Sequence, residues 1–305
     1  MDDPGKPSRE RQPLKPLRQR LEDTRKATGA PWEILERDYL LSFILAGIAG
    51  VKDLNDTLVF KGGTALKKCY FGDYRFSEDL DYSALPNAPQ GKVLEKLMRE
   101  ACDKASVLMN EYSPVQVICK RYSEKKPHPY GQEAFEIRAR FPWHKEPLAR
   151  VLVEITYKEK LLKPAVKKTL IHKYGERLSI KIAVYSLEEI IAEKLRAILQ
   201  NKRILEKRGW SRSRARDFYD LWRILKTYSR SLKLTCFKHF LELKCQMKGV
   251  SFKNSDDFFP DVVMREVERT WDQWLGPLVP ELPPYKKVID ELKPFVEKIL
   301  KNARL

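Results

Sequence analysis

The chain has 305 residues, of which 43% are hydrophobic, so it can bury at least one full core. It carries 59 Lys and Arg against 42 Asp and Glu, and the formal net charge of +17 favours polyanionic partners such as RNA, DNA or nucleoside triphosphates. The five scattered cysteines contain no C-x-x-C pair and fit neither a disulfide framework nor a zinc site. The N-terminus shows no signal-like apolar segment, and the longest apolar run, residues 39–51, is shorter than the roughly 20 residues that span a bilayer. We therefore expect a cytoplasmic globular protein without membrane contact.

The first part of the chain predicts a basic segment followed by a core helix. Residues 1–30 are rich in Pro, Arg and Lys, which predicts a loosely ordered segment with one short helix near residues 17–26. Pro31 suits the first turn of a helix, and apolar residues then recur at helical spacing as far as Ile48. A short apolar run at residues 58–60 follows and leads into a Gly-Gly turn with a helical pattern behind it.

The middle of the chain mixes strand and helix patterns before the sequence becomes purely helical. Residues 75–83 alternate as an exposed strand does, and residues 92–112 predict an amphipathic helix. From Ser186 onward only helical patterns occur, with breaks at Pro260 and near residues 277–285. We therefore expect an α/β domain over residues 31–185 and an all-helical domain over residues 186–305. Three strands in a meander are predicted at residues 115–122, 135–143 and 150–157, and a further strand at residues 178–185.

The turn Gly62-Gly63-Thr64 stands between a predicted strand and a predicted helix. Glycines at such a place let backbone N–H groups approach a phosphate closely, and the helix N-terminus adds a favourable dipole. The turn has the spacing of neither a Walker loop nor a dinucleotide-binding motif. Alone it is weak evidence for a triphosphate site, because most such turns are only turns.

Asp79 follows Gly63 by sixteen residues and is followed by a second aspartate, Asp81. Residues two apart on a strand point to the same side, so both carboxylates can reach a pair of divalent ions about 3.5 to 4 Å apart. Two like charges held this close are costly without a cation. An isolated Asp-x-Asp also fits two solvated aspartates on a surface strand, but the glycine turn upstream favours a metal site.

The run FKGGTALKKCYFGDYRFSEDLDYS resembles the signature of polymerase-beta-like nucleotidyltransferases, in which G-[GS]-[ST] is followed at a short distance by D-x-D. With Arg75 and Ser77 just ahead of the aspartates, it is similar to the AbiEii-type and MenT-like nucleotidyltransferase toxins of toxin-antitoxin and phage-defence systems. The resemblance implies that Thr64 and the neighbouring amides of the glycine turn hold a triphosphate. It also implies that the two aspartates bind two magnesium ions.

A third carboxylate is expected from a later strand. Members of the superfamily add one there, and Glu154 in RVLVEITY is the best match in this sequence. Its strand places Glu154 among apolar neighbours, so the carboxylate needs a partner. By resemblance it completes the metal site and activates the attacking hydroxyl, either by holding the ion or as a general base. The alternative is a glutamate paired with Arg138 or Arg140 of the preceding strand.

Lys194 is the most informative residue of the helical part. Ser186 and Glu189 form an S-x-x-E capping box that predicts the start of a long helix, and Lys194 lies within the apolar stripe of that helix. A lysine in a buried stripe is unfavourable unless its ammonium group meets an anion or reaches solvent. The stretch EEIIAEKLRAIL resembles the A-E-K-L-x-A-[IL] stretch of the AbiEii family, which implies that Lys194 contacts the triphosphate.

The next segment, RSRARDFYDLWRIL, contains the R-D-x-x-D-L form found in the same family. Helical projection places Asp217 at the edge of an apolar stripe and turns Asp220 away from it. By resemblance Asp217 orients Lys194 or the nucleotide, and a charge pair between them would keep the lysine protonated. Asp220 is expected in a surface ion pair or as a helix-stabilising partner.

Basic residues crowd the connection between these two helices, with Trp210 among them. Such a run is often only a solvated face, but beside a triphosphate site it can also grip an RNA backbone and stack a terminal base. Further along, Trp271 and Trp274 have the spacing of helix packing, and we expect both in the core. The basic residues are Arg196, Lys202, Arg203, Lys207, Arg208, Arg212, Arg214 and Arg216.

These motifs together predict an α/β fold with a polymerase-beta-like core and a mixed sheet, completed by a C-terminal helical domain that supplies Lys194 and Asp217. The expected reaction is metal-dependent attack of an acceptor hydroxyl on the α-phosphate of a nucleoside triphosphate, with two magnesium ions and release of pyrophosphate. We expect the 3′ end of tRNA as the acceptor and an antitoxin encoded nearby as a partner. Two alternatives stay open: nucleotidylation of a protein or small molecule, and a non-catalytic nucleic-acid-binding module.

Overall fold

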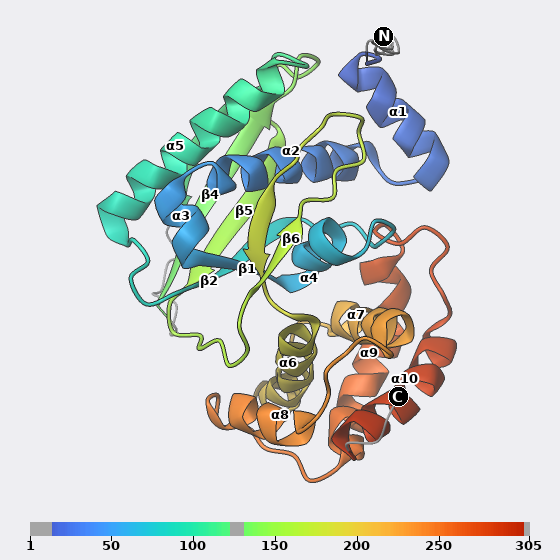
Figure 1. Ribbon diagram of the computed structural model, residues 1–305. Coiled ribbons are helices and arrows are strands. Elements are labelled where there is room, and N and C mark those ends of the chain that lie inside the picture. Colours follow the sequence, from blue (N-terminus) through green and yellow to red (C-terminus); the bar gives the residue numbers. More distant parts are fainter. Residues whose placement is uncertain (1–13, 123–130, 302–305) are drawn as a thin grey trace, which may run out of the picture.

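The computed structural model describes residues 14–122 and 131–301. Within these residues an α/β half lies above a half made of helices in the view of Figure 1. The predicted fold class, a mixed sheet with helices followed by C-terminal helices, is confirmed. No helix in the described ranges is long and apolar enough to cross a membrane.

The end of the basic N-terminal segment differs from the loosely ordered chain that its composition predicts. It forms helix α1 (Leu17–Thr28), which covers the short helix expected there. Leu17 and Leu21 are buried, and α1 packs against the next helix. These two leucines anchor α1 to the core, whereas residues 1–13 of the expected segment lie outside the described residues.

The strands in the described part of the chain form one seven-stranded sheet in the order β3-β4-β5-β2-β1-β7-β6. The strands β3, β4 and β5 form the predicted antiparallel meander, whereas β2 runs parallel to β5 and antiparallel to β1. The edge strand β6 has no counterpart among the predicted strands, because VKKT is too short and too polar to show a strand pattern. The bounds are β1 (Leu58–Lys61), β2 (Asp79–Ala84), β3 (Gln116–Tyr122), β4 (Gln132–Arg140), β5 (Ala149–Thr156), β6 (Val166–Thr169) and β7 (Lys181–Val184).

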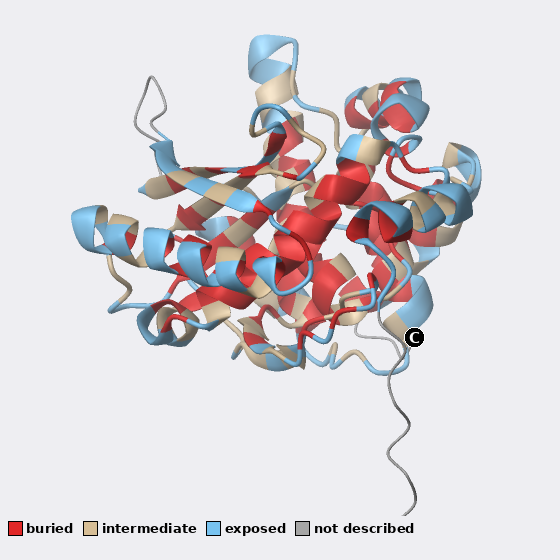
Figure 2. Ribbon diagram, turned by 90° about the horizontal axis from the view of Figure 1, so that it is seen from above, coloured by how far each residue is buried: buried red, intermediate tan, exposed pale blue. Residues whose placement is uncertain are grey.

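Helix α2 (Trp32–Ala49) is buried on almost every side, as the apolar run over residues 39–49 requires. It packs against α5 (Gly91–Asn110), and the two helices lie against the β3 and β5 side of the sheet (Figure 1). Figure 2 shows the buried residues gathered in the middle of the molecule, with exposed faces on the outer helices. The remaining helices of this half are α3 (Lys52–Thr57), α4 (Gly62–Ala65) and the π-helical turn η1 (Leu66–Tyr70).

The chain after Ser186 forms helices and no strand within the described residues. The long helix α6 packs against α7, α8 and α9, and the buried residues of these helices belong to the same core cluster as those of the α/β half. Trp271 belongs to that core, as predicted, and its Nε1 donates a hydrogen bond to the carbonyl of Pro283 at 3.0 Å. The bounds are α6 (Leu187–Arg208), α7 (Ala215–Tyr228), α8 (Phe237–Gln246), η2 (Ser255–Phe258), α9 (Asp261–Leu275) and α10 (Tyr285–Leu300).

Of the capping box predicted at the start of α6, the Ser186 half is present and the Glu189 half is not. The Ser186 hydroxyl accepts a hydrogen bond from the backbone N–H of Glu189 at 3.2 Å, as a capping residue does. The Glu189 carboxylate, however, lies 2.5 Å from the fully buried ammonium group of Lys244 on α8. A buried ammonium group needs an anion. The Glu189 side chain therefore pairs with Lys244 and does not complete the capping box.

We expect the neighbouring carboxylate, Glu159, to make the fold sensitive to acid. Burial raises its pKa, but the hydrogen bond from Arg196 and the ammonium groups of Lys244 and Lys248 outweigh burial and lower the pKa from its ordinary 4.5 to about 2. A carboxyl group with a lowered folded-state pKa stabilises the fold above its unfolded pKa, and this contribution is lost as the pH falls through the folded value. The free energy of unfolding in urea should therefore fall from about pH 5 towards pH 2.

The variant Glu159→Gln should show a shallower dependence on pH in this range than the wild type. The control is Glu206→Gln, at an exposed position near the end of α6, which should keep the wild-type dependence. Equal slopes for Glu159→Gln and the wild type would contradict the assignment.

Candidate active site

A cleft of about 360 Å³ lies between the two halves of the chain. It gathers most of the predicted site residues, although Thr64 and Glu154 do not line it. The α/β half contributes Gly62, Gly63, Arg75, Ser77, Glu78, Asp79 and Asp81. The helical half contributes Lys194, Arg212, Ser213, Arg214, Arg216, Asp217 and Trp274.

Close contacts require both glycines of the turn that follows β1. Gly62 has a φ of +81°, a conformation that side chains disfavour, and a Cβ there would overlap the Oδ2 atom of Asp81. A Cβ at Gly63 would overlap the guanidinium group of Arg75. Asp81 and Arg75 can therefore approach the turn this closely only because neither glycine has a side chain.

Thr64 is buried beneath the turn, so its side chain is not placed to hold a triphosphate as the resemblance implies. Its hydroxyl oxygen lies 2.5 Å from the carbonyl oxygen of Asp79 and 2.6 Å from the hydroxyl oxygen of Ser77. These bonds fix the start of β2 against α4. The first N–H groups of a helix have no partner within it, so the backbone of the turn is what remains for a phosphate.

Strand β2 places Asp79 at the mouth of the cleft and Asp81 deeper inside, where it is half-buried. In register, Asp81 stands between Lys61 of β1 and Glu154 of β5. Burial and the carboxylates of Glu154 and Asp79 raise the pKa of Asp81 to about 7 against the opposing effect of Lys61. Burial and Glu78 likewise raise the pKa of Asp79. Carboxylates crowded in this way favour a bound cation.

Glu154 is half-buried, and its Oε1 accepts a hydrogen bond from Nε2 of Gln132 at 2.5 Å. Arg138, one of the two arginines considered as its partner, pairs with Glu136 at 2.7 Å. Among the described residues no three His, Cys, Asp or Glu side chains lie close enough together to bind a metal ion by themselves. Two aspartates nevertheless fit magnesium, which prefers oxygen ligands and takes the others from water and substrate phosphates.

Lys194 is buried, as its place in the apolar stripe of α6 predicts. Its ammonium nitrogen lies 2.8 Å from Oδ1 of Asp217 and 2.6 Å from Oδ2 of Asp220. Burial favours the neutral amine, but the two carboxylates outweigh burial and raise the pKa of Lys194. In the same way, Lys194 and Arg214 outweigh burial and lower the pKa of Asp217. The lysine is therefore held as a cation in the wall of the cleft.

Asp220 corrects the expectation of a surface ion pair or simple helix-stabilising role, because its side chain is fully buried. It accepts hydrogen bonds from Nε and Nη2 of Arg75 at 2.6 and 2.7 Å and from the hydroxyl of Tyr74 at 2.6 Å. Helical projection fails here because the α/β half covers the face of α7 that would otherwise meet solvent. Arg75 and Asp220 thereby join the two halves of the cleft.

Glu78 is a cleft residue that sequence reasoning missed. One of its carboxylate oxygens lies 2.5 Å from Nη1 of Arg37 on α2, and the other lies 3.1 Å from Nη2 of Arg216 on α7. The only signal in the sequence is its place next to Asp79 in the aspartate motif. Glu78 thus brings arginines from two distant helices to the mouth of the cleft.

Trp274 also differs from its expected place in the core, because it lines the cleft and is 38% exposed, unlike the buried Trp271. The guanidinium carbon of Arg216 lies 5.4 Å from its ring centre. Trp210, the aromatic residue considered for base stacking, is 71% exposed and does not line the cleft. The aromatic wall of the cleft therefore comes from α9 and not from the basic connection.

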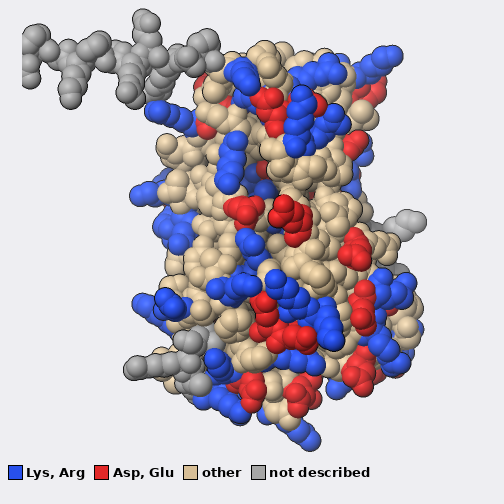
Figure 3. Space-filling view, turned by 90° about the vertical axis from the view of Figure 1, so that its right-hand side faces the viewer, with Lys and Arg blue, Asp and Glu red and all other residues tan. Residues whose placement is uncertain are grey.

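The basic connection contributes only part of its charge to the cleft. Arg212, Arg214 and Arg216 line it, whereas Arg196 is buried and pairs with Glu159 at 2.6 Å. Figure 3 shows that, on the side it presents, Lys and Arg side chains are spread among Asp and Glu side chains and do not form one patch. The attraction of the cleft for an anion therefore comes from its own arginines, Arg212, Arg214 and Arg216.

The mixed sheet, glycine turn and aspartate pair define the nucleotidyltransferase class. The family model described as nucleotidyl transferase AbiEii toxin, type IV toxin-antitoxin system, matches residues 44–301, so the chain belongs to this family. The recognised family and the enzyme class are thus confirmed.

Two solved structures resemble the chain. MenT4, a nucleotidyltransferase toxin from Mycobacterium tuberculosis H37Rv, is 19% identical over 93% of this chain and 88% of that chain, with a TM-score of 0.62, which shows a shared fold. An antigenic nucleotidyltransferase-like protein from Paracoccidioides brasiliensis is 17% identical over 74% of this chain and 98% of that chain, but its TM-score of 0.35 is too low to support an argument. No curated protein matches the chain.

We expect Gly62→Ala to reduce nucleotidyl transfer by more than about tenfold, because the new Cβ displaces Asp81 in addition to straining the backbone. The matched control is Gly29→Ala, whose φ of +69° is equally unfavourable but whose Cβ would meet nothing within 4 Å. Gly29→Ala should lower the free energy of unfolding by about 1 to 2 kcal/mol and leave transfer intact. Equal transfer rates for the two variants at matched folded fractions would argue against the contact.

Proposed function

We propose that this protein transfers a nucleoside monophosphate from a nucleoside triphosphate to a hydroxyl at the 3′ end of tRNA. The observation that carries the proposal is one cleft with Asp79 and Asp81 on one side and Lys194 with three arginines on the other. Carboxylates suit metal ions and the cationic groups suit phosphates, so the cleft fits a metal-bound polyphosphate. Membership of a nucleotidyltransferase family supports this use of the cleft.

Asp79 and Asp81 are the residues that we propose as ligands of two magnesium ions, with Glu154 completing the set. The raised pKa of Asp81, caused by burial and by Glu154, supports a site that favours a bound cation. When bound, the ions would neutralise charge on the phosphates and lower the pKa of the attacking hydroxyl. Because Glu154 stands beside Asp81 in register, it can act on the metal site or accept the hydroxyl proton through water.

The triphosphate is proposed to lie between the glycine turn and Lys194. The backbone N–H groups of Gly62 and Gly63 would hold its oxygens, and the ammonium group of Lys194 would balance its charge. Asp217 orients Lys194 and keeps it protonated. In the reaction the acceptor oxygen forms a bond to the α-phosphorus, and the bond from that phosphorus to the bridging oxygen breaks, which releases pyrophosphate.

The choice of RNA as the acceptor rests on charge. The net charge of +17 and the arginines at the cleft support RNA over a neutral small molecule. A toxin of this family would act on tRNA in the cytoplasm, in phage defence or another stress response, with an antitoxin encoded nearby. Transfer of label to protein instead of RNA would favour the alternative acceptor.

We expect Asp79→Ala combined with Asp81→Ala to abolish transfer while leaving the fold intact. The assay incubates the protein with each α-labelled nucleoside triphosphate, magnesium and total tRNA, and then follows label in RNA and in protein on denaturing gels. The matched control is Asp53→Ala with Asp56→Ala, which removes two exposed aspartates of α3. Chelation of magnesium should abolish transfer by the wild type as well, and transfer that survives chelation or the first double variant would rule out the proposed metal site.

We expect Trp274→Ala to raise the KM for the nucleoside triphosphate by about tenfold, because stacking a base on an aromatic side chain contributes about 1 to 3 kcal/mol. Trp274→Phe should retain most of the affinity, since phenylalanine keeps an aromatic face. Trp210→Ala is the matched control, because it removes an exposed tryptophan outside the cleft. Steady-state kinetics with all four triphosphates would measure the effect, and equal KM values for both alanine variants would exclude base stacking on Trp274.

A further inference from the structure

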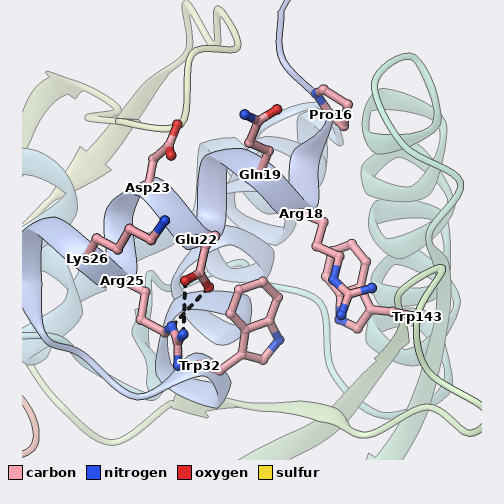
Figure 4. A pocket seen from close by; sticks show the side chains of 9 residues that line it. All are labelled: Pro16, Arg18, Gln19, Glu22, Asp23, Arg25, Lys26, Trp32 and Trp143. Carbon is pink, nitrogen blue, oxygen red and sulfur yellow. Dashed lines mark hydrogen bonds and ion pairs between the residues drawn. The ribbon is translucent and has the colours of Figure 1, made fainter.

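A second cavity lies away from the active-site cleft, between α1 and a pair of tryptophans. Its volume is about 740 Å³, roughly twice that of the cleft. Figure 4 shows Arg18, Glu22 and Arg25 of α1 reaching toward the two indole rings, with Gln19 and Asp23 pointing away from them. Its lining consists of Pro16, Arg18, Gln19, Glu22, Asp23, Arg25, Lys26, Trp32 and Trp143.

The two tryptophans form a rigid aromatic surface. The ring centres of Trp32 and Trp143 are 5.8 Å apart at an angle of 68°, and Trp143 is stacked on Phe141 at 5.2 Å. Both indole N–H groups donate to Oε1 of the buried Glu36 at 2.5 Å, and His144 lies 3.0 Å from the same oxygen. The polar edges are thus fixed inside the protein, and both half-buried rings line the cavity. Because the two rings meet edge to face, a flat ligand stacks on only one of them at a time, and the fixed ring costs little entropy when it does.

The charges along the cavity leave a positive balance. Glu22 pairs with Arg25 at 2.9 Å, and Asp23 pairs with Lys15 at 2.8 Å. Arg18 and Lys26 are exposed on the same helix and form no ion pair with any described residue. The cavity therefore combines aromatic faces with two available cations, which suits a nucleobase and its phosphates better than an acidic peptide without rings.

The cavity is connected to the active site through adjacent residues of α2. Glu36 holds the two tryptophans, and the next residue, Arg37, contacts Glu78 and the backbone carbonyl of Arg150. Glu78 in turn precedes Asp79 at the mouth of the cleft. Neighbouring residues of α2, Glu36 and Arg37, thus link the tryptophan pair to the mouth of the cleft.

From this arrangement we propose that the cavity between α1 and the Trp32–Trp143 pair is a second RNA site, which anchors an unpaired part of the acceptor strand. One or more bases stack on the indole rings, and Arg18 and Lys26 contact the phosphates. The inference rests on the proposed RNA acceptor, but RNA binding can be measured without any transfer reaction.

The first test is equilibrium binding of a labelled single-stranded 12-nucleotide RNA to the full chain, followed by fluorescence anisotropy without triphosphate or magnesium. Arg18→Glu combined with Lys26→Glu should weaken binding by at least about tenfold and reduce the slope of log affinity against log salt by about 1.4, since each phosphate contact on a single strand contributes about 0.7. The matched control is Lys286→Glu with Lys287→Glu, which reverses two exposed charges on α10, far from α1 in Figure 1. Equal affinity of both double variants overturns the proposal, and so does an RNA duplex or an acidic peptide that competes as well as the single strand.

The second test separates the anchor from the active site by the length of the acceptor. Trp143→Phe should retain binding of the 12-nucleotide RNA, whereas Trp143→Ala should weaken it, with circular dichroism as the check on folding. In the transfer reaction, the charge-reversed Arg18 and Lys26 variant should raise the KM for tRNA and leave the rate with a dinucleotide acceptor unchanged, because a dinucleotide is too short to reach the cavity. A chain that binds RNA through Arg18 and Lys26 but transfers no nucleotide to it would support the anchor and refute the proposed acceptor, whereas an equal KM increase for both acceptors would refute the anchor.

Discussion

The cleft depends on one buried ion cluster, formed by Lys194, Asp217, Asp220 and Arg75. Charges removed from water are stable only with partners, and removing one member leaves another uncompensated. Because Arg75 belongs to the α/β half and the other three to the helical half, the cluster fixes the width of the cleft between them. Gly63 packs against the same Arg75, so the glycine turn is positioned by this cluster as well. The backbone of the glycine turn, the cationic wall of the cleft and the contact between the two halves therefore depend on the same cluster.

The parts of the site that the sequence predicts are those that depend on a single element. Alternation along β2 places Asp79 and Asp81 on one side of the strand, and the period of α6 places Lys194 in its apolar stripe. The meander of β3, β4 and β5 follows from three successive strand patterns with no helical pattern between them. In each case the position of the residue or strand is determined by the periodicity of its own element or by the strand that follows it in the sequence.

The parts that could not be predicted depend on what another element places against a residue. A helical projection shows that Asp220 leaves the apolar stripe, but not that Arg75 and Tyr74 cover it. Likewise, the three-residue spacing of Trp271 and Trp274 suggests that both lie in the core. Only Trp271 is buried, because the cleft opens beside the last turn of α9, where Trp274 lies. Propensity and spacing contain no information about such partners from distant parts of the chain.

The division of the cleft between distant segments has a consequence for the order of synthesis. The ribosome makes the glycine turn and the aspartate pair early, the lysine of α6 much later, and Trp274 close to the C-terminal end of the chain. A nascent chain interrupted after β7 carries carboxylates with no cationic wall opposite them. The lining of the cleft is complete only after α9 has emerged and docked. For a protein of a toxin family, synthesis through α9 is therefore a precondition for any reaction in this cleft.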